Sequence, residues 1–141
     1  MEKTGRSLFR EPCAVLGFGR IGRVLAELLR ALGAEVTAAA RRPEVLAGAE
    51  SLGFRTAAFA AAAAQSAFVF NTVPAPVLTP EEAEKLPPQT VWIELASAPG
   101  GLPADAKQSC AVLAAGSLPG RLLPRSAARL LYEAILRNWE E

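Results

Sequence analysis

Residues 13–22, CAVLGFGRIG, join a short apolar run to three glycines spaced G-x-G-x-x-G. The glycines are Gly17, Gly19 and Gly22, and a helical periodicity of apolar residues continues from Arg20 to Leu32. A glycine turn between a buried strand and an amphipathic helix is typical of sites where backbone amides bind the phosphates of a dinucleotide. This stretch therefore predicts a strand, a phosphate-binding turn and a helix, in that order.

Each position in the turn requires glycine for a different physical reason. Gly17 permits a tight turn, Gly19 lets the backbone approach a pyrophosphate, and Gly22 lets the helix pack closely on the strand. The alternative is a glycine turn that only packs, but the strand before it and the helix after it favour a nucleotide site. The candidate cofactor-binding residues of the turn are Gly17, Phe18, Gly19, Arg20, Ile21 and Gly22.

Apolar strand-like runs alternate with helical patterns along the whole chain. After Gly33, which we expect to end the first helix, the strand-like runs are residues 35–40, 54–56, 68–71, 91–96 and 111–115. Helices are predicted from Pro43, in the alanine-rich stretch 57–67, after a Thr79–Glu82 capping box, and over 124–139. The pattern predicts an α/β fold: a doubly wound, parallel, six-stranded sheet of the Rossmann type, in the strand order 3-2-1-4-5-6.

The length of 141 residues fits one domain. Residues 1–11 are polar and are interpreted as a lead-in segment. Residues 12–141 are then the dinucleotide-binding (Rossmann) domain, because no repeat or linker divides them.

The position about twenty residues beyond Gly19 distinguishes the two nicotinamide cofactors. An acidic side chain there would accept a hydrogen bond from a ribose 2′-hydroxyl, but this chain has Ala40, Arg41 and Arg42. Two guanidinium groups bind a 2′-phosphate through charge-assisted hydrogen bonds, and Arg20 adds a third positive charge. The alternative is a pair of solvated arginines beside a helix start, a place that disfavours basic residues. We therefore expect NADP, with NAD less favoured.

Three loops rich in proline, glycine and small residues follow predicted strands: residues 71–78, 96–101 and 116–120. Ligands of such sheets bind outside the carboxyl ends of the strands. One such loop alone would be a plain chain reversal, whereas three at one edge favour a nicotinamide pocket. The candidate residues from these loops are Asn71, Thr72, Val73, Pro74, Ala96, Ser97, Leu118 and Pro119.

The composition argues against several classes of function. The 15 basic and 14 acidic residues are spread along the chain, so neither a nucleic acid nor a membrane surface is an expected partner. The first twelve residues have no apolar signal core, so a cytoplasmic location is expected. The chain has no histidine and no cluster with metal-ligand spacing, and Cys13 and Cys110 are interpreted as core residues.

Four segments carry a family resemblance: VLGFGRIG, FNTVPAPVL, ELASAPGG and GSLPGRLLP. Over residues 13–138 they together resemble the nucleotide-binding half of one family, the A-type subunits of dipicolinate synthase. The glycine turn occurs in many dehydrogenases, but the three loops are specific as a set. The resemblance implies an NADP-dependent dehydrogenase of sporulation that oxidises a dihydrodipicolinate-type ring to dipicolinate. It also implies two partners, a small dicarboxylate substrate and a flavoprotein-like second subunit.

One departure from that family concerns catalysis. Its members have an N-terminal substrate domain, whereas this chain starts just before the first strand of the nucleotide-binding domain. The resemblance therefore implies a fragment without the substrate domain, which binds cofactor but does not turn over alone. The catalytic residues are unassigned, because the base would come from the other domain or from water. A homo-oligomer is compatible with this interpretation.

Two other interpretations stay open. The chain could be the nucleotide-binding fragment of a 2-hydroxyacid or shikimate-type dehydrogenase, although the first kind often uses a histidine that is missing here. It could also be a non-catalytic NAD(P)-sensing module, which would not need the proline-glycine loops after the fifth and sixth strands.

Overall fold

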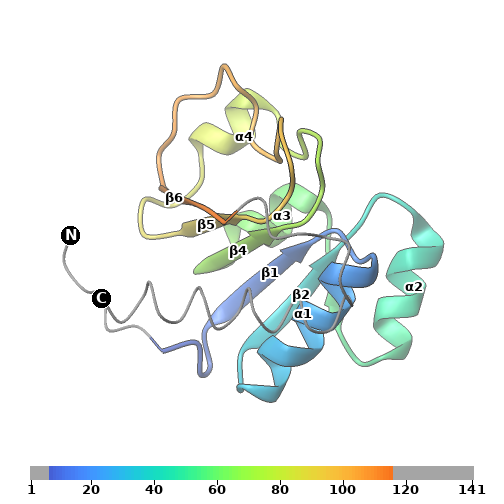
Figure 1. Ribbon diagram of the computed structural model, residues 1–141. Coiled ribbons are helices and arrows are strands. Elements are labelled where there is room, and N and C mark those ends of the chain that lie inside the picture. The colour runs from blue at the N-terminus through green and yellow to red at the C-terminus, as the bar shows by residue number, and fades with distance from the viewer. Residues whose placement is uncertain (1–6, 116–141) are drawn as a thin grey trace.

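The computed structural model of the chain describes residues 7–115. Its elements are, in order, β1 (Pro12–Leu16), α1 (Arg20–Ala31), β2 (Glu35–Ala39), α2 (Pro43–Ser51), β3 (Arg55–Thr56), α3 (Phe59–Ala64), β4 (Phe68–Asn71), α4 (Pro80–Glu84), β5 (Val91–Glu94) and β6 (Ala111–Ala114). The six strands form one parallel sheet in the order β3-β2-β1-β4-β5-β6 (Figure 1). The α/β fold and the strand order predicted from the sequence are confirmed. The helix predicted over residues 124–139 lies outside the described residues.

The register of the strands brings their carboxyl ends to one edge of the sheet. Leu16 at the end of β1 lies opposite Ala39 of β2 and Asn71 of β4, and Asn71 lies opposite Glu94 of β5. Every loop that follows these strands therefore starts from the same edge. In parallel α/β sheets this edge is where ligands bind.

Two hydrophobic clusters cover the two faces of the sheet, because successive side chains of a strand point to opposite faces. In β1, Cys13 and Val15 pack with α1 and α2, while Ala14 and Leu16 pack with α3 and α4. Helices on both faces explain why β1 and β4 are continuous apolar runs.

Helix α1 follows the glycine turn and buries one face against the sheet. Leu25 and Leu29 on that face are almost wholly buried, and each contributes about 1.5–3 kcal/mol by leaving water. The other face is polar and includes the exposed Arg23–Glu27 pair, whose Nε and Oε1 atoms lie 3.4 Å apart. Burial of the leucine face holds the start of α1, and with it the glycine turn, on the sheet.

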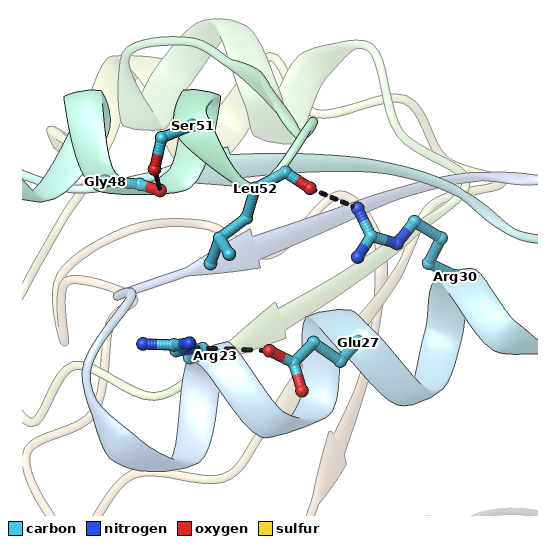
Figure 2. Close-up of polar contacts among 6 residues, drawn as sticks. All are labelled: Arg23, Glu27, Arg30, Gly48, Ser51 and Leu52. Carbon is cyan, nitrogen blue, oxygen red and sulfur yellow. Dashed lines mark hydrogen bonds and ion pairs between the residues drawn. The ribbon is translucent and has the colours of Figure 1, made fainter.

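Arg30 joins the end of α1 to the end of α2. Its Nη1 atom donates to the carbonyl oxygen of Leu52, the C-cap of α2, at 2.6 Å (Figure 2). Its guanidinium carbon lies 4.1 Å from the centroid of the Phe54 ring. A cation near the last carbonyls of a helix is favourable, so Arg30 stabilises the pairing of these two helices.

The helix ends agree with the signals in the sequence. Gly33 follows α1 with a φ of 84°, a left-handed conformation that suits glycine. At the start of α4, Thr79 Oγ1 accepts from the Glu82 amide at 3.2 Å, and Glu82 Oε2 accepts from the Thr79 amide at 2.8 Å. The predicted capping box is therefore confirmed.

Strand β5 ends at Glu94, two residues before the end predicted at Ala96. Beyond Glu94, the Leu95 amide still donates to the Asn71 carbonyl of β4 at 2.9 Å, whereas the Ala96 amide donates to a side-chain oxygen, Glu94 Oε1, at 3.2 Å.

Residues 7–11 of the lead-in are attached to the turn before β2. The Arg10 amide donates to the Gly33 carbonyl at 2.8 Å, and the Glu35 amide donates to the Glu11 carbonyl at 3.0 Å. The ring of Phe9 occupies the space where a side chain at Gly33 would lie. None of the helices formed by the described residues is long and apolar enough to cross a membrane.

Both cysteines are free thiols: Cys13 is a core residue as predicted, whereas Cys110, just before β6, is only partly buried. Cys13 is fully buried in β1, and this burial, with a smaller effect of the Glu11 charge, raises the pKa of its thiol to about 12. Cys110 is partly buried against the cluster of α3 and α4, and burial raises the pKa of its thiol too. Neutral thiols of this kind act as small apolar side chains.

Candidate nucleotide-binding site

Two glycines of the turn leave no space for a side chain. Gly17 has a φ of 90°, and a Cβ atom there would collide with Thr72 Oγ1 and lie 2.9 Å from Val73 Cγ2. A Cβ atom on Gly22 would collide with the carbonyl oxygen of Gly17. These contacts support the roles predicted for Gly17 in a tight turn and for Gly22 in close packing of α1 on β1.

Gly19 differs from both, because a Cβ atom there would meet no heavy atom within 4 Å. Gly19 is the N-cap of α1, with a φ of −82°, and no side chain caps the first amides of this helix. A glycine at this position therefore provides open space beside the turn, and no unusual backbone conformation requires it. Uncapped amides beside open space are what the phosphates of a dinucleotide require, so the turn fits this cofactor.

Thr72 connects the glycine turn to β4. Its hydroxyl donates to the Leu16 carbonyl at 2.8 Å and lies 3.3 Å from the Gly17 carbonyl oxygen, while its amide donates to the Leu16 carbonyl at 2.9 Å. On the other side, the Gly17 amide donates to the Ala39 carbonyl of β2 at 2.8 Å. The turn is thus held from both neighbouring strands.

The side chain of Phe18 anchors the turn in the core. Its ring packs edge-on against Phe54, with centroids 5.5 Å apart and planes at 67°, in the cluster beneath α1 and α2. What Phe18 offers to a ligand is therefore its backbone.

The arginines predicted to select the cofactor are all exposed. Arg41 Nη2 donates to the Pro76 carbonyl at 3.2 Å, so this side chain extends from the end of β2 to the loop after β4. Arg42 Nε lies 3.8 Å from Glu44 Oε1 at the start of α2. Contacts this exposed contribute little to stability, so both guanidinium groups can turn to an anion.

A carboxylate lies at the end of β5, where the loops after β4 and β5 meet. Glu94 Oε1 accepts from Asn71 Nδ2 at 2.6 Å and from the Ala96 amide at 3.2 Å. Glu94 Oε2 accepts from Trp92 Nε1 and from the Gly101 amide, both at 3.0 Å. We call these five residues the Glu94 unit.

Asn71, a predicted cofactor-binding residue, is fully buried within the Glu94 unit. Besides its bond to Glu94, its Nδ2 donates to the Val73 carbonyl at 2.9 Å, and its Oδ1 accepts from the Val73 amide at 3.2 Å. The side-chain amide is therefore engaged inside the protein and holds the loop that begins at Thr72. Through this side chain Asn71 shapes the site rather than facing a ligand.

Two glycines of the loop after β5, Gly100 and Gly101, pack against the side chains of Glu94 and Asn71. A Cβ atom on Gly100 would lie 3.0 Å from Glu94 Oε2, and one on Gly101 would lie 2.5 Å from Asn71 Nδ2. Gly100 also has a φ of 81°. The Pro-Gly-Gly turn thus packs directly on the Asn71–Glu94 pair.

Glu94 and Trp92 were not among the residues that the sequence singled out. The signal that could have found them is a charged residue at the end of the apolar run VWIEL. Charged side chains inside such runs are rare unless they are paired, so Glu94 itself predicts buried donors nearby.

The sheet brings almost all predicted site residues to one edge. The turn residues 17–22 follow β1, residues 40–42 follow β2, residues 71–74 end or follow β4, and residues 96–97 follow β5. Leu118 and Pro119 lie outside the described residues. Contact of these residues with a cofactor stays a prediction.

Comparison with known proteins identifies the family. Residues 1–96 match the family described as "D-isomer specific 2-hydroxyacid dehydrogenase, NAD binding domain". The chain belongs to this family. It is therefore a dehydrogenase-type domain for a nicotinamide cofactor, as the glycine turn indicates.

The resemblance to the A-type subunit of dipicolinate synthase is also confirmed. The curated protein of that name from Bacillus subtilis (strain 168) is 32% identical over 140 residues, which cover 96% of this chain and 47% of that protein. The crystal structure of the corresponding protein from Bacillus halodurans is 32% identical and has a TM-score of 0.74, covering 98% of this chain and 49% of that one. The Bacillus subtilis crystal structure gives 29% identity and a TM-score of 0.75, over 96% and 47%.

A more distant structure shares the fold. The transhydrogenase from Sinorhizobium meliloti is 24% identical with a TM-score of 0.64, over 97% of this chain and 48% of that one. The chain thus spans about half the length of the curated and solved relatives that it matches.

Proposed function

We propose that this domain binds NADP and is the cofactor half of an enzyme that forms dipicolinate from a dihydrodipicolinate-type precursor. The observation that carries the proposal is the 32% identity with the A-type subunit of dipicolinate synthase across almost the whole chain. The proposal includes a role in sporulation, a small dicarboxylate substrate and a flavoprotein-like second subunit. The cytoplasmic location expected from the sequence stays part of it.

The proposed reaction needs removal of a hydride and loss of a proton from the ring. The domain supplies the surface that holds the hydride acceptor: the glycine turn for the pyrophosphate and the loops after β4 and β5 for the nicotinamide. The chain has no histidine to take the proton. We therefore propose that the base comes from water or from the part of the enzyme equivalent to the other half of the relatives.

The preference for NADP rests on Arg41 and Arg42, which follow β2 at the edge next to the glycine turn. Arg41 is bonded to a neutral carbonyl and Arg42 to an exposed carboxylate. A 2′-phosphate offers Arg41 a charge-assisted partner in place of a neutral carbonyl, and it offers Arg42 a hydrogen-bonded dianion in place of a carboxylate 3.8 Å away. Each such hydrogen bond contributes about 1.5–3 kcal/mol, which is a factor of about ten or more in affinity.

The test of this preference is a titration with NADP and NAD at low and at moderate salt. We expect tighter binding of NADP, and a loss of about tenfold or more in NADP affinity for Arg41→Ala and for Arg42→Ala. NAD affinity should change little. The matched control is Arg55→Ala, which removes the same charge from β3, where Arg55 pairs with the exposed Glu35. Equal affinity for the two cofactors, or tighter NAD, contradicts the proposal.

The reaction itself is tested by NADP reduction with freshly prepared dihydrodipicolinate. We expect the 141-residue chain to bind NADP without turnover, because one domain does not enclose the substrate and exclude water. Turnover is expected from a longer form with a domain equivalent to the other half of the relatives, mixed with the second subunit. Robust turnover by the chain alone would show that its site is already complete.

A further inference from the structure

The carboxylate of Glu94 has an unusual set of partners, because all four are donors. They are the Asn71 side-chain amide, the Trp92 indole N–H and the backbone amides of Ala96 and Gly101, at 2.6 to 3.2 Å. Each carboxylate oxygen has two of them. A carboxylate offers about four lone-pair positions, so these partners occupy its capacity as an acceptor.

This arrangement explains why the residue is glutamate rather than glutamine. A glutamine amide would place an NH₂ group where an oxygen now accepts two hydrogen bonds. This NH₂ group would then face two other donors in a half-buried place, which is costly. The same saturation removes Glu94 from the candidates for the catalytic base, because no position remains on it for a proton from the substrate.

The partners of Glu94 come from three places: Asn71 ends β4, Trp92 lies in β5, and Ala96 and Gly101 belong to the loop after β5. The side-chain amide of Asn71, which donates to Glu94, also forms two hydrogen bonds with the Val73 backbone in the loop after β4. Gly101, whose amide donates to Glu94, accepts at its carbonyl a hydrogen bond from the Val77 amide at 2.9 Å. The Glu94 side chain therefore links the loop after β4 to the loop after β5, beside the direct backbone hydrogen bond between Val77 and Gly101.

We propose that Glu94 is a positioning residue: it holds these two loops in the arrangement that receives the nicotinamide end of the cofactor, and it transfers no proton. The proposal rests on the proposed function, because it takes the cofactor to be NADP. The glycine turn and the arginines at the end of β2 are outside the Glu94 unit. They meet the loop after β4 at Thr72, which is bonded directly to the end of β1, and through the exposed Arg41–Pro76 hydrogen bond, which contributes little. Loss of Glu94 should therefore affect the nicotinamide end of the cofactor much more than the other end.

The test compares two probes with the full chain. NADPH has both ends, whereas adenosine 2′,5′-bisphosphate has the adenosine and the 2′-phosphate but no nicotinamide. In Glu94→Gln we expect NADPH affinity to fall by tenfold or more and the affinity for the bisphosphate to stay within twofold of wild type. The matched control is Glu27→Gln, the same change on the exposed face of α1, which should alter neither affinity.

A second variant keeps the test decisive if Glu94→Gln does not fold. Trp92→Phe removes one donor and leaves the carboxylate in place, so we expect a several-fold loss for NADPH and no change for the bisphosphate. Circular dichroism establishes that each variant is folded. Equal losses for both probes, or no loss for either, overturn the positioning role.

The outcome for the wild-type chain separates this inference from the proposed function. If wild type binds neither probe, the proposed NADP site itself is wrong. If it binds the bisphosphate as tightly as NADPH, the NADP site stands, but the loops do not receive the nicotinamide and the role of Glu94 is overturned.

Discussion

The two halves of the candidate site are formed by different parts of the residues: one by backbone groups and the other by side chains. In the half around β1 and β2, the glycine turn is formed by backbone, and its defining property is the space left open at Gly19. In the half around β4 and β5, the loops are held by side chains, with Glu94 and Asn71 at the centre. The first half leaves the first amides of α1 without a side-chain cap, whereas the second pairs the polar groups of Asn71 and Glu94 with one another and with the backbone.

This difference teaches what each half can do. Uncapped amides and exposed guanidinium groups attract an anion, so the first half fits the phosphates of the cofactor. A saturated hydrogen-bond network attracts nothing, but it fixes a shape. Under the proposed function, the second half would receive the planar nicotinamide ring, and a fixed shape is what positions such a ring for hydride transfer.

The largest effect is expected at Gly22, where a side chain meets backbone. Gly22→Ala places a methyl group against the Gly17 carbonyl, in a turn that Thr72 and Ala39 hold in place. We expect a loss of about 3 kcal/mol in the free energy of unfolding, measured by urea denaturation. Gly48→Ala is the matched control, because nothing lies within 4 Å there and alanine favours a helix by about 0.5–1 kcal/mol. Equal stability of the two variants would contradict the close packing of α1 on the turn.

A smaller effect is expected at Gly101, where a side chain meets another side chain. Gly101→Ala brings a methyl group to 2.5 Å from Asn71 Nδ2, and we expect a loss of about 1–3 kcal/mol. Because the obstacle is the asparagine amide, Asn71→Ala should remove most of this additional cost. A double-mutant cycle by chemical denaturation measures the coupling between the two changes. Additive losses would show that the Gly101 turn does not depend on Asn71.

The smallest effect on stability is expected at Gly19, where a side chain meets open space. Gly19→Val should lower the free energy of unfolding by about 0.5–1 kcal/mol, because valine is a poorer N-cap than glycine, while the φ of Gly19 is ordinary and no atom is near. The same side chain fills the space for the pyrophosphate, so dinucleotide binding should be lost. Thermal unfolding and a cofactor titration of the same sample check both parts. Retained tight binding would place the phosphates elsewhere.

The sequence by itself determined the features that depend on local chemistry. The order of strands and helices follows from apolar periodicity, and the glycine turn follows from the spacing of Gly17, Gly19 and Gly22. The capping box at Thr79 and the turn at Gly33 follow from residues a few positions apart. In each case the interacting groups are neighbours in the chain, so their pattern is visible without a fold.

Only the tertiary structure decided which distant groups meet. Asn71 and Glu94 are 23 residues apart, Arg41 and Pro76 are 35 apart, and Thr72 and Leu16 are 56 apart. Their contacts depend on the register of parallel strands, which sets Leu16 opposite Asn71 and Asn71 opposite Glu94. A residue type such as glutamate shows that a partner is needed, but the identity of that partner is a property of strand pairing. For this reason the geometry of the glycine turn could be predicted from the sequence, while the Glu94 unit could not.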